Sequence, residues 1–183
     1  KPNDFKFPVK NHVELLEELD LADFDRASEL SGSGFYVLKG EMALLNQALI
    51  SFAIDFMHKK GYEYIEPPLM IQKKILDAAM DTQEFAGTIY RIEGEDLNMI
   101  GTSEHALLGL HENEAIKEQD LPKKYFSYSM CFRKEIGSHG INEKGLWRTH
   151  QFNKVEQFIF CKPEESYKLY DELLANTENL FQA

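Results

Sequence analysis

Two aromatic-rich segments joined by a glycine-containing connection constrain the fold of this chain most. Residues 125–135 and 146–160 alternate in character and are rich in Phe and Tyr, a composition typical of β-strands. The connection between them contains Gly137, Gly140 and Gly145. This pattern predicts two long antiparallel strands that form a hairpin at the centre of a sheet.

Helical periodicity surrounds the predicted hairpin on both sides. Apolar residues recur at helical spacing in six segments, which predicts helices over residues 12–21, 23–30, 42–60, 71–80, 103–116 and 163–183. Shorter β-prone runs predict strands over 35–39, 62–65, 88–92 and 97–100. The run at 62–65 stops at Pro67-Pro68, and because Pro cannot donate to a strand ladder, this strand should lie at a sheet edge or an interface. The mixture predicts one α+β domain over residues 1–183, in which helices flank an antiparallel sheet.

Composition limits the classes of function. The 183 residues carry a formal charge of −11, whereas a domain that wraps nucleic acid needs clustered Lys and Arg. The hairpin departs from this balance, with five basic and two acidic residues between Phe132 and Lys154. Two cysteines without metal-ligand spacing, and no apolar run long enough to span a bilayer, predict a soluble cytoplasmic protein with no membrane partner.

The predicted hairpin carries a mixed set of side chains on one face. Side chains alternate along a strand, so Arg133 and Glu135 share a face of the first strand. One face of the second strand holds Arg148, His150, Phe152, Lys154 and Glu156. Guanidinium groups hold phosphate oxygens, an aromatic ring stacks on adenine and a carboxylate accepts from an amino group, so the set suits a nucleotide. The same charges could form cross-strand ion pairs on a solvated face, and the pattern by itself leaves both interpretations open.

The spacing of these residues resembles that of a known family. Two runs, CFRKE at 131–135 and GLWRTHQF at 145–152, followed by KVE at 154–156, resemble the second signature motif of class II aminoacyl-tRNA synthetases in its seryl-tRNA synthetase form. The segment that ends at Lys60, followed by Gly61-Tyr62 and Pro67-Pro68, resembles the first motif. Thr102-Ser103-Glu104 resembles the Thr-x-Glu element of the seryl enzymes, although these residues at a helix start are also typical of capping.

The resemblance implies a role for each ATP-binding residue. Arg133 would bridge the α-phosphate and the serine carboxylate, and Arg148 would hold the terminal phosphates. Glu135 would meet the adenine amino group and Phe152 the face of the ring. The two arginines are the implied catalytic residues, because the reaction needs positioning and charge stabilisation more than proton transfer.

The resemblance also implies a serine pocket formed by Thr102, Glu104 and Glu156 together with Arg133. Serine would be activated by ATP to seryl-adenylate and then transferred to tRNA(Ser). The third motif of the family and the Mg²⁺ ligands that accompany ATP are expected after residue 183, and the tRNA-binding helical arm before residue 1. The chain would therefore be a truncated catalytic domain, inactive in aminoacylation by itself and homodimeric through the long helix and the strand before Pro67-Pro68.

Three alternatives compete with this interpretation. A synthetase paralogue that activates a small amino acid for a carrier protein commonly has an altered pocket, so Thr102 and Glu104 favour the seryl enzyme. A non-catalytic synthetase-like binding module has no physical need for the combined hairpin set. A metal protein is disfavoured because the six histidines lack ligand spacing, and no Walker A or Rossmann glycine motif offers another nucleotide site.

Overall fold

The structure is a computed structural model that describes residues 5–84, 86–135 and 144–183. Two compact units divide the chain, one of residues 1–47 and 137–150, the other of residues 48–136 and 151–183. The division falls within the long helix α3 (Gly40–Lys59), so both units take residues from it. Gly137 and Gly140 of the predicted hairpin connection lie outside the described residues.

The first unit is built from short elements. It contains α1 (His12–Glu18), β1 (Ala22–Asp23), α2 (Phe24–Ser31) and β2 (Val37–Leu38). Asn11 and Asp23 accept backbone hydrogen bonds as N-caps of the two helices, which satisfies amides that a helix start leaves unpaired. The antiparallel β1–β2 pair and the buried Leu16 and Phe24 hold this unit together.

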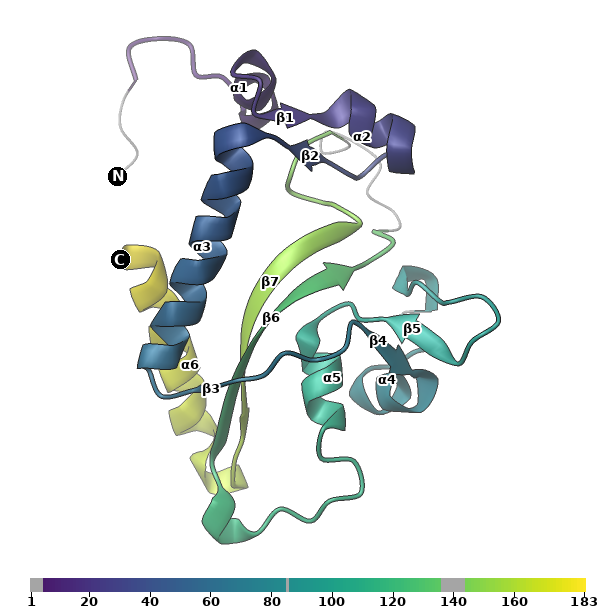
Figure 1. The fold of residues 1–183 in the computed structure, drawn as a ribbon. Coiled ribbons are helices and arrows are strands. Elements are labelled where there is room, and N and C mark those ends of the chain that lie inside the picture. Colours follow the sequence, from purple (N-terminus) through teal and green to yellow (C-terminus); the bar gives the residue numbers. More distant parts are fainter. Residues whose placement is uncertain (1–4, 85, 136–143) are drawn as a thin grey trace. The chain divides into compact units, whose positions relative to one another are not determined.

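The second unit contains the predicted hairpin. β6 (Lys123–Phe132) and β7 (Gln151–Phe160) pair antiparallel over ten residues each and lie side by side in Figure 1. β3 (Glu63–Tyr64) pairs with β6 in parallel and forms the edge of the sheet, whose order is β3-β6-β7. The hairpin strands and the edge position are confirmed, and the parallel β3 makes the sheet mixed.

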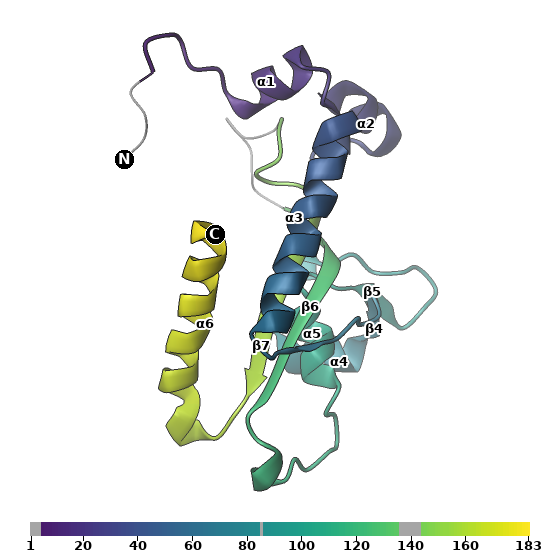
Figure 2. The ribbon, with the colours of Figure 1, turned by 60° about the vertical axis from the view of Figure 1, so that its left-hand side comes forward.

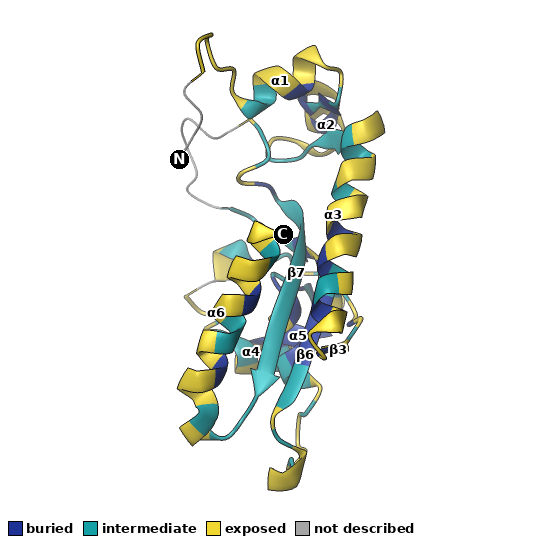
Figure 3. Cartoon of the chain, turned by 90° about the vertical axis from the view of Figure 1, so that its left-hand side faces the viewer, coloured by how far each residue is buried: buried dark blue, intermediate teal, exposed yellow. Residues whose placement is uncertain are grey.

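One face of this sheet forms an apolar core with two helices. Phe126 of β6 is fully buried against Met57 of α3 and Tyr62. Leu173 of α6 (Ser166–Gln182) packs on the same cluster. In Figure 2 α6 follows β7 and runs back beside it. Figure 3 shows that the buried residues of α6 lie on one side of the helix. Full burial of a Leu or Phe side chain contributes roughly 1.5–3 kcal/mol to the free energy of folding. The apolar contacts of Leu173 therefore hold α6 on the sheet.

The opposite face is covered by α5 (Ser103–Gly109). Beside it lie α4 (Lys73–Ala79) and the antiparallel pair of β4 (Met70–Gln72) and β5 (Leu97–Met99). Gly109 permits close approach of α5 to α4, because a Cβ there would lie 2.5 Å from Ile75 Cγ2. Short 3₁₀ helices are η1 (Ala86–Thr88), η2 (Glu118–Asp120) and η3 (Pro163–Glu165).

Several predicted boundaries are wrong. β6 ends at Phe132 and β7 begins at Gln151, so the strands are shorter at the hairpin end than predicted. The helix predicted from Ile71 begins at Lys73, because Ile71 is a buried strand residue paired with Asn98. The helix predicted over 103–116 ends at Gly109. In the stretch predicted as a strand over 88–92, the structure has the end of η1 and one isolated bridge at Arg91. Among the described residues no helix is long and apolar enough to cross a membrane.

Candidate active site

The candidate site lies on the sheet face that α5 covers. Alternation along β7 puts Phe152, Lys154 and Glu156 on this face. Their cross-strand partners on β6 are Cys131, Ser129 and Ser127, which are all buried. Two of these partners are serines, whose small side chains leave room for the long Lys154 and Glu156 to lie over the strand pair and meet the start of α5.

Glu156 is the centre of a hydrogen-bond network. Its Oε2 accepts a short hydrogen bond from Thr102 Oγ1, one of 3.0 Å from Ser103 Oγ and one of 3.2 Å from the backbone N–H of Glu104. Its Oε1 accepts from Lys154 Nζ at 2.5 Å. Three consecutive residues of one segment thus bind one carboxylate that follows them by more than 50 positions in the sequence.

Thr102 serves two purposes at once. It is the N-cap of α5 with an extended backbone (φ −168°, ψ 150°), and its hydroxyl accepts from the N–H of Glu104. The same hydroxyl donates to Glu156 and accepts from Lys154 Nζ at 2.9 Å. Capping and the contact with Glu156 are therefore compatible, and the alternative that the sequence posed between them does not arise.

The network keeps Glu156 ionised. Burial by itself would raise the pKa of this carboxyl, but hydrogen bonds from Lys154 and Thr102, the charge of Lys154 and the bond from Ser103 outweigh it, and the pKa is lowered. A buried anion in contact with a cation and several donors is electrostatically satisfied. The site therefore presents an ionised carboxylate, Glu156, paired with the ammonium of Lys154.

Arg133 lies directly after the end of β6. Its Nε donates to the carbonyl of Gly101 at 3.0 Å, and its guanidinium carbon lies 5.2 Å from the centre of the Phe152 ring. The hydrogen bond to Gly101 holds one edge of the planar guanidinium, and the Phe152 ring packs against its face. The side chain is exposed, and the two amino groups of the fork have the geometry that holds a carboxylate or phosphate by two parallel bonds.

His105 is a buried residue of α5 that the sequence did not single out for the site. Its Nδ1 is buried without a hydrogen-bond partner among the described residues. Burial lowers the pKa of this imidazole, while Glu156 opposes and Arg133 and Lys154 reinforce the decrease. The ring packs near Gly101, where a Cβ would lie 3.5 Å from His105 Cε1 and 3.8 Å from Arg133 Nε. A neutral imidazole therefore supports the backbone that holds Arg133.

The structure brings together most of the predicted site residues in the second unit. Thr102, Glu104 and Glu156 meet through hydrogen bonds, and Arg133 contacts Phe152. Lys154 and Ser103 also belong to this network but had no predicted role. The signal for Lys154 was its place on the same strand face as Glu156, and Ser103 carried no signal beyond its neighbours.

The remaining predicted residues lie outside the two strands. Arg133 and Glu135 follow β6, so they do not share a strand face, and Glu135 has a left-handed backbone (φ 41°) that no strand allows. Arg148 and His150 precede β7, so their predicted strand face is wrong as well. Both belong to the first unit, where the N–H of His150 donates to the Gly34 carbonyl at 2.9 Å.

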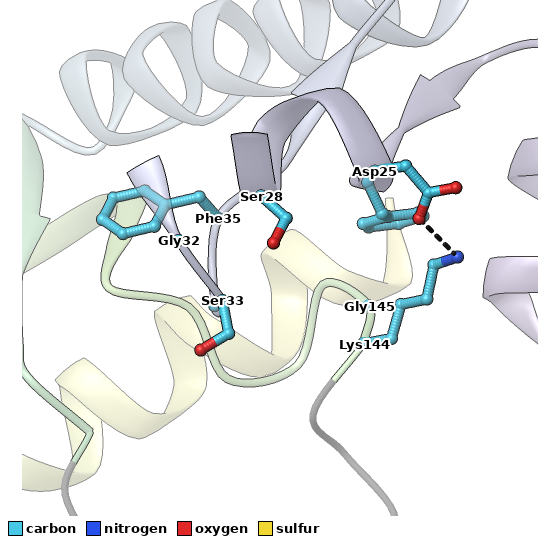
Figure 4. Close-up of a pocket in the computed structure, with 9 residues that line it drawn as sticks. Asp25, Ser28, Gly32, Ser33, Phe35, Lys144 and Gly145 are labelled. Atoms are coloured by element: carbon cyan, nitrogen blue, oxygen red, sulfur yellow. Dashed lines mark hydrogen bonds and ion pairs between the residues drawn. The ribbon is translucent and has the colours of Figure 1, made fainter. Parts of the chain in front are cut away.

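A separate cavity of about 230 Å³ lies in the first unit (Figure 4). Ser28, Ser33 and Phe35 line it, and an ion pair of 3.3 Å between Asp25 and Lys144 closes one side. None of the site residues predicted from the sequence lines this cavity. Within the described part of the chain, no group of three or more His, Cys, Asp or Glu side chains is arranged to hold a metal ion.

Comparison with known proteins identifies the family. Residues 88–183 match the model of the tRNA synthetase class II core domain (G, H, P, S and T). The chain is 46% identical over 182 residues to the serine–tRNA ligase of Methanocella arvoryzae. The matched region covers all of this chain and 43% of that protein.

Two solved structures have the same fold. The seryl-tRNA synthetase from Pyrococcus horikoshii complexed with ATP superposes with a TM-score of 0.93 at 44% identity, over 97% of this chain and 40% of that one. The cytoplasmic serine–tRNA ligase from Naegleria fowleri in complex with AMP has a TM-score of 0.88 at 35% identity, over 93% and 41%. The chain thus spans about two-fifths of the length of the relatives it matches. It belongs to the class II tRNA synthetase core-domain family, in which its near relatives are serine–tRNA ligases.

Proposed function

We propose that the protein containing this chain activates serine with ATP and transfers the seryl group to tRNA(Ser). The observation that carries the proposal is the network in which Glu156 binds Thr102, Ser103 and the backbone of Glu104, beside an arginine oriented by Phe152. Such a site offers an ionised carboxylate for an ammonium group and a guanidinium for a carboxylate, which are the two ends of an α-amino acid. The ATP and AMP complexes of the two solved relatives support the nucleotide.

In the proposed first step, a serine carboxylate oxygen attacks the α-phosphorus of ATP, and the bond to the β-phosphate bridging oxygen breaks to release pyrophosphate. Arg133 holds the attacking carboxylate and the α-phosphate, which lowers repulsion between two anions and stabilises the charge that develops on phosphorus. Phe152, fixed at 5.2 Å from the Arg133 guanidinium, supplies a stacking face for adenine. Glu135 accepts from the adenine amino group, and Arg148 binds the terminal phosphates.

Selection of serine depends on the polar pocket. Thr102, Glu104 and Glu156 offer partners for the amino and hydroxyl groups, and alanine would leave part of this buried polar set unpaired. In the second step a terminal hydroxyl of tRNA attacks the adenylate carbonyl, and AMP leaves. Mg²⁺ accompanies ATP in the proposal, with ligands that we expect outside these 183 residues.

Assembly and location are also proposed. α3 exposes Leu45, Leu49 and Phe52, which lie on one side of the helix at i, i+4 and i+7. We propose that this side and β3 contribute to a homodimer interface, and that the protein acts in the cytoplasm, where tRNA is charged. The chain spans about two-fifths of its relatives, so we further propose that these 183 residues do not aminoacylate tRNA by themselves.

ATP–pyrophosphate exchange in the full-length protein tests the proposal. We expect exchange that depends on serine and is lost in Arg133→Ala, whereas Arg26→Ala, which removes an exposed arginine paired with Asp23, should retain it. Undiminished exchange in Arg133→Ala would refute the role of Arg133. Exchange driven by alanine or glycine in preference to serine, or transfer to a carrier protein rather than tRNA(Ser), would replace the proposed function by that of the carrier-protein paralogue.

A further inference from the structure

Two polar groups of the proposed serine pocket, the Glu156 carboxylate and the Thr102 hydroxyl, already have their hydrogen-bonding positions in use. A carboxylate has about four acceptor positions. Glu156 accepts from Thr102 Oγ1, Ser103 Oγ, the N–H of Glu104 and Lys154 Nζ. The Thr102 hydroxyl donates to Glu156 and accepts from Lys154 Nζ and the N–H of Glu104, which uses its one donor and both acceptor positions. An incoming ammonium group that binds Glu156 and Thr102 therefore needs one existing donor to leave.

Lys154 is the donor most able to leave. Thr102, Ser103 and the N–H of Glu104 belong to the start of α5, and two of these residues are almost fully buried. The Lys154 side chain is 32% exposed, whereas that of Glu156 is 14% exposed. A lysine ends in a flexible four-carbon stem, so its ammonium can move without any change in the backbone. The same stem reaches solvent from its place on β7.

We propose that Lys154 is a resident cation that occupies the ammonium position of the empty pocket and gives way when the amino acid binds. The inference rests on the proposed function, because it assumes that the amino acid binds at Thr102 and Glu156. Lys154 keeps Glu156 paired while the pocket is empty, and the substrate ammonium then takes over its hydrogen bonds to Glu156 Oε1 and Thr102 Oγ1. Lys154 thus acts as a positioning residue that selects for a ligand with a primary ammonium group.

The proposal predicts a change in binding that depends on the ammonium group of the ligand. Lys154→Met removes the competing cation, so serinamide, which keeps the ammonium, should bind about two- to fivefold more tightly, the range expected for loss of one partly exposed ion pair. Glycerate, in which a hydroxyl replaces the ammonium, should gain nothing. Lys154→Arg keeps the cation and should bind serinamide no more tightly than the parental protein does.

Calorimetric titration of the full-length protein with serinamide and with glycerate measures both affinities without the reaction. Lys162→Met is the matched control, because Lys162 pairs with Glu118 outside this network and its loss should leave both affinities unchanged. Melting curves of the variants show whether each one is folded. If Lys154→Met is unfolded, a crystal structure of the parental protein with serine decides: Lys154 Nζ should then lie beyond hydrogen-bond distance of Glu156 Oε1.

Two results would overturn the inference. One is an equal change in the two affinities, and the other is a serine complex in which Lys154 still donates to Glu156 Oε1. Serine-dependent exchange is measured in parallel. Exchange in the parental protein without an ammonium-specific change in Lys154→Met would refute the inference alone, whereas an ammonium-specific change without serine-dependent exchange would refute the proposed function alone.

Discussion

The Arg133 guanidinium donates from Nε to the backbone carbonyl of Gly101, 32 positions earlier in the chain, at 3.0 Å. The acceptor is the residue just before Thr102, so a single peptide bond joins the residue that holds the proposed carboxylate clamp to the first residue of the proposed ammonium pocket. Buried His105 packs near Gly101. The distance between the two ends of a bound amino acid would therefore be set mainly by backbone.

This arrangement predicts that Arg133→Lys is not a conservative change. A lysine cannot hold the Gly101 carbonyl with one nitrogen while offering a planar fork to the substrate. We expect the rate of serine-dependent exchange to fall by about 10²–10³, comparable to loss of one charge-stabilising donor at a reacting centre. Initial rates of serine-dependent ATP–pyrophosphate exchange measure this change, with Arg26→Lys as the control. A loss confined to the KM for ATP would contradict the proposed contact with the serine carboxylate.

Glu156 should make stability depend on pH in the acid range. Its pKa is lowered in the folded protein relative to 4.5, so the carboxylate contributes stability that is present above 4.5 and is lost as the pH falls through the lower folded value. Glu156→Gln should flatten that part of the stability profile. Urea unfolding at several pH values below 6 measures the difference between the two proteins. Glu178→Gln, which removes an exposed carboxylate of α6, is the control for the loss of one negative charge.

A buried polar network should fix α6 to the sheet. Asn176 is 4% exposed and donates to Tyr62 Oη at 3.3 Å and to Gln157 Oε1 at 3.2 Å. Tyr62 Oη in turn donates to Glu172 at 2.9 Å. Asn176→Ala leaves buried partners unsatisfied, so we expect the free energy of unfolding to fall by about 1–3 kcal/mol.

Chemical denaturation measures the effect of Asn176→Ala, and Glu178→Ala on the exposed side of the same helix serves as the control. If the free energy of unfolding falls no more in Asn176→Ala than in the control, water replaces the hydrogen bonds of Asn176 without loss of stability, which would contradict the prediction. Exchange activity should change less than stability, because Gln157 directs its side chain to the opposite face of β7 from Glu156.

Gly145 should be needed for the docking of the segment that carries Trp147. Its φ is +134°, and a Cβ would lie 2.4 Å from His12 Nε2. The two ring nitrogens of His12 face two donors: Nε2 lies 3.1 Å from the Leu146 N–H and Nδ1 lies 3.1 Å from Trp147 Nε1, and a neutral imidazole accepts from one of them. Gly145→Ala should therefore displace the segment and change the emission of Trp147, the single tryptophan of the chain. Gly32→Ala is the matched control, because its φ is +88° but a Cβ there meets nothing within 4 Å.

The two glycine variants separate backbone strain from steric contact. Strain alone costs about 1–3 kcal/mol in each, so both should lower stability, while the spectral change should occur in Gly145→Ala only. Equal spectra for the two variants would mean that the contact with His12 does not hold the segment.

The sequence predicted the parts of the fold that depend on strong local periodicity. The strand pair 123–132 and 151–160 and the helices near residues 12, 24, 40 and 166 follow from alternation or helical spacing. Ile71 was misassigned because a short apolar run has no period of its own, and pairing with β5 decides its conformation. The ends of the hairpin strands were misplaced because pairing there stops at positions that no single residue marks.

The site shows a similar division. Strand alternation correctly placed Phe152, Lys154 and Glu156 on one face. Thr102 was grouped with Glu156 by the resemblance of Thr102-Ser103-Glu104 to the Thr-x-Glu element, and the structure brings the two side chains into contact. The contact between Thr102 and Glu156 is set by how α5 packs on the sheet, which no local pattern contains. The roles of Lys154, Ser103 and His105 could not be predicted for the same reason, because they depend on distances between segments that lie far apart in the chain.

The order of synthesis gives the ten-residue pairing of β6 with β7 one more consequence. A growing chain that has left the ribosome as far as Phe132 contains α5 and all of β6, but its only complete neighbour for β6 is the two-residue β3 among the described strands. One edge of β6 then lacks its partner, and an unpaired strand edge can associate with other chains. Emergence of β7 covers that edge and delivers Glu156 to Thr102 in the same event. The nascent protein thus loses its exposed edge and gains its proposed amino-acid pocket together.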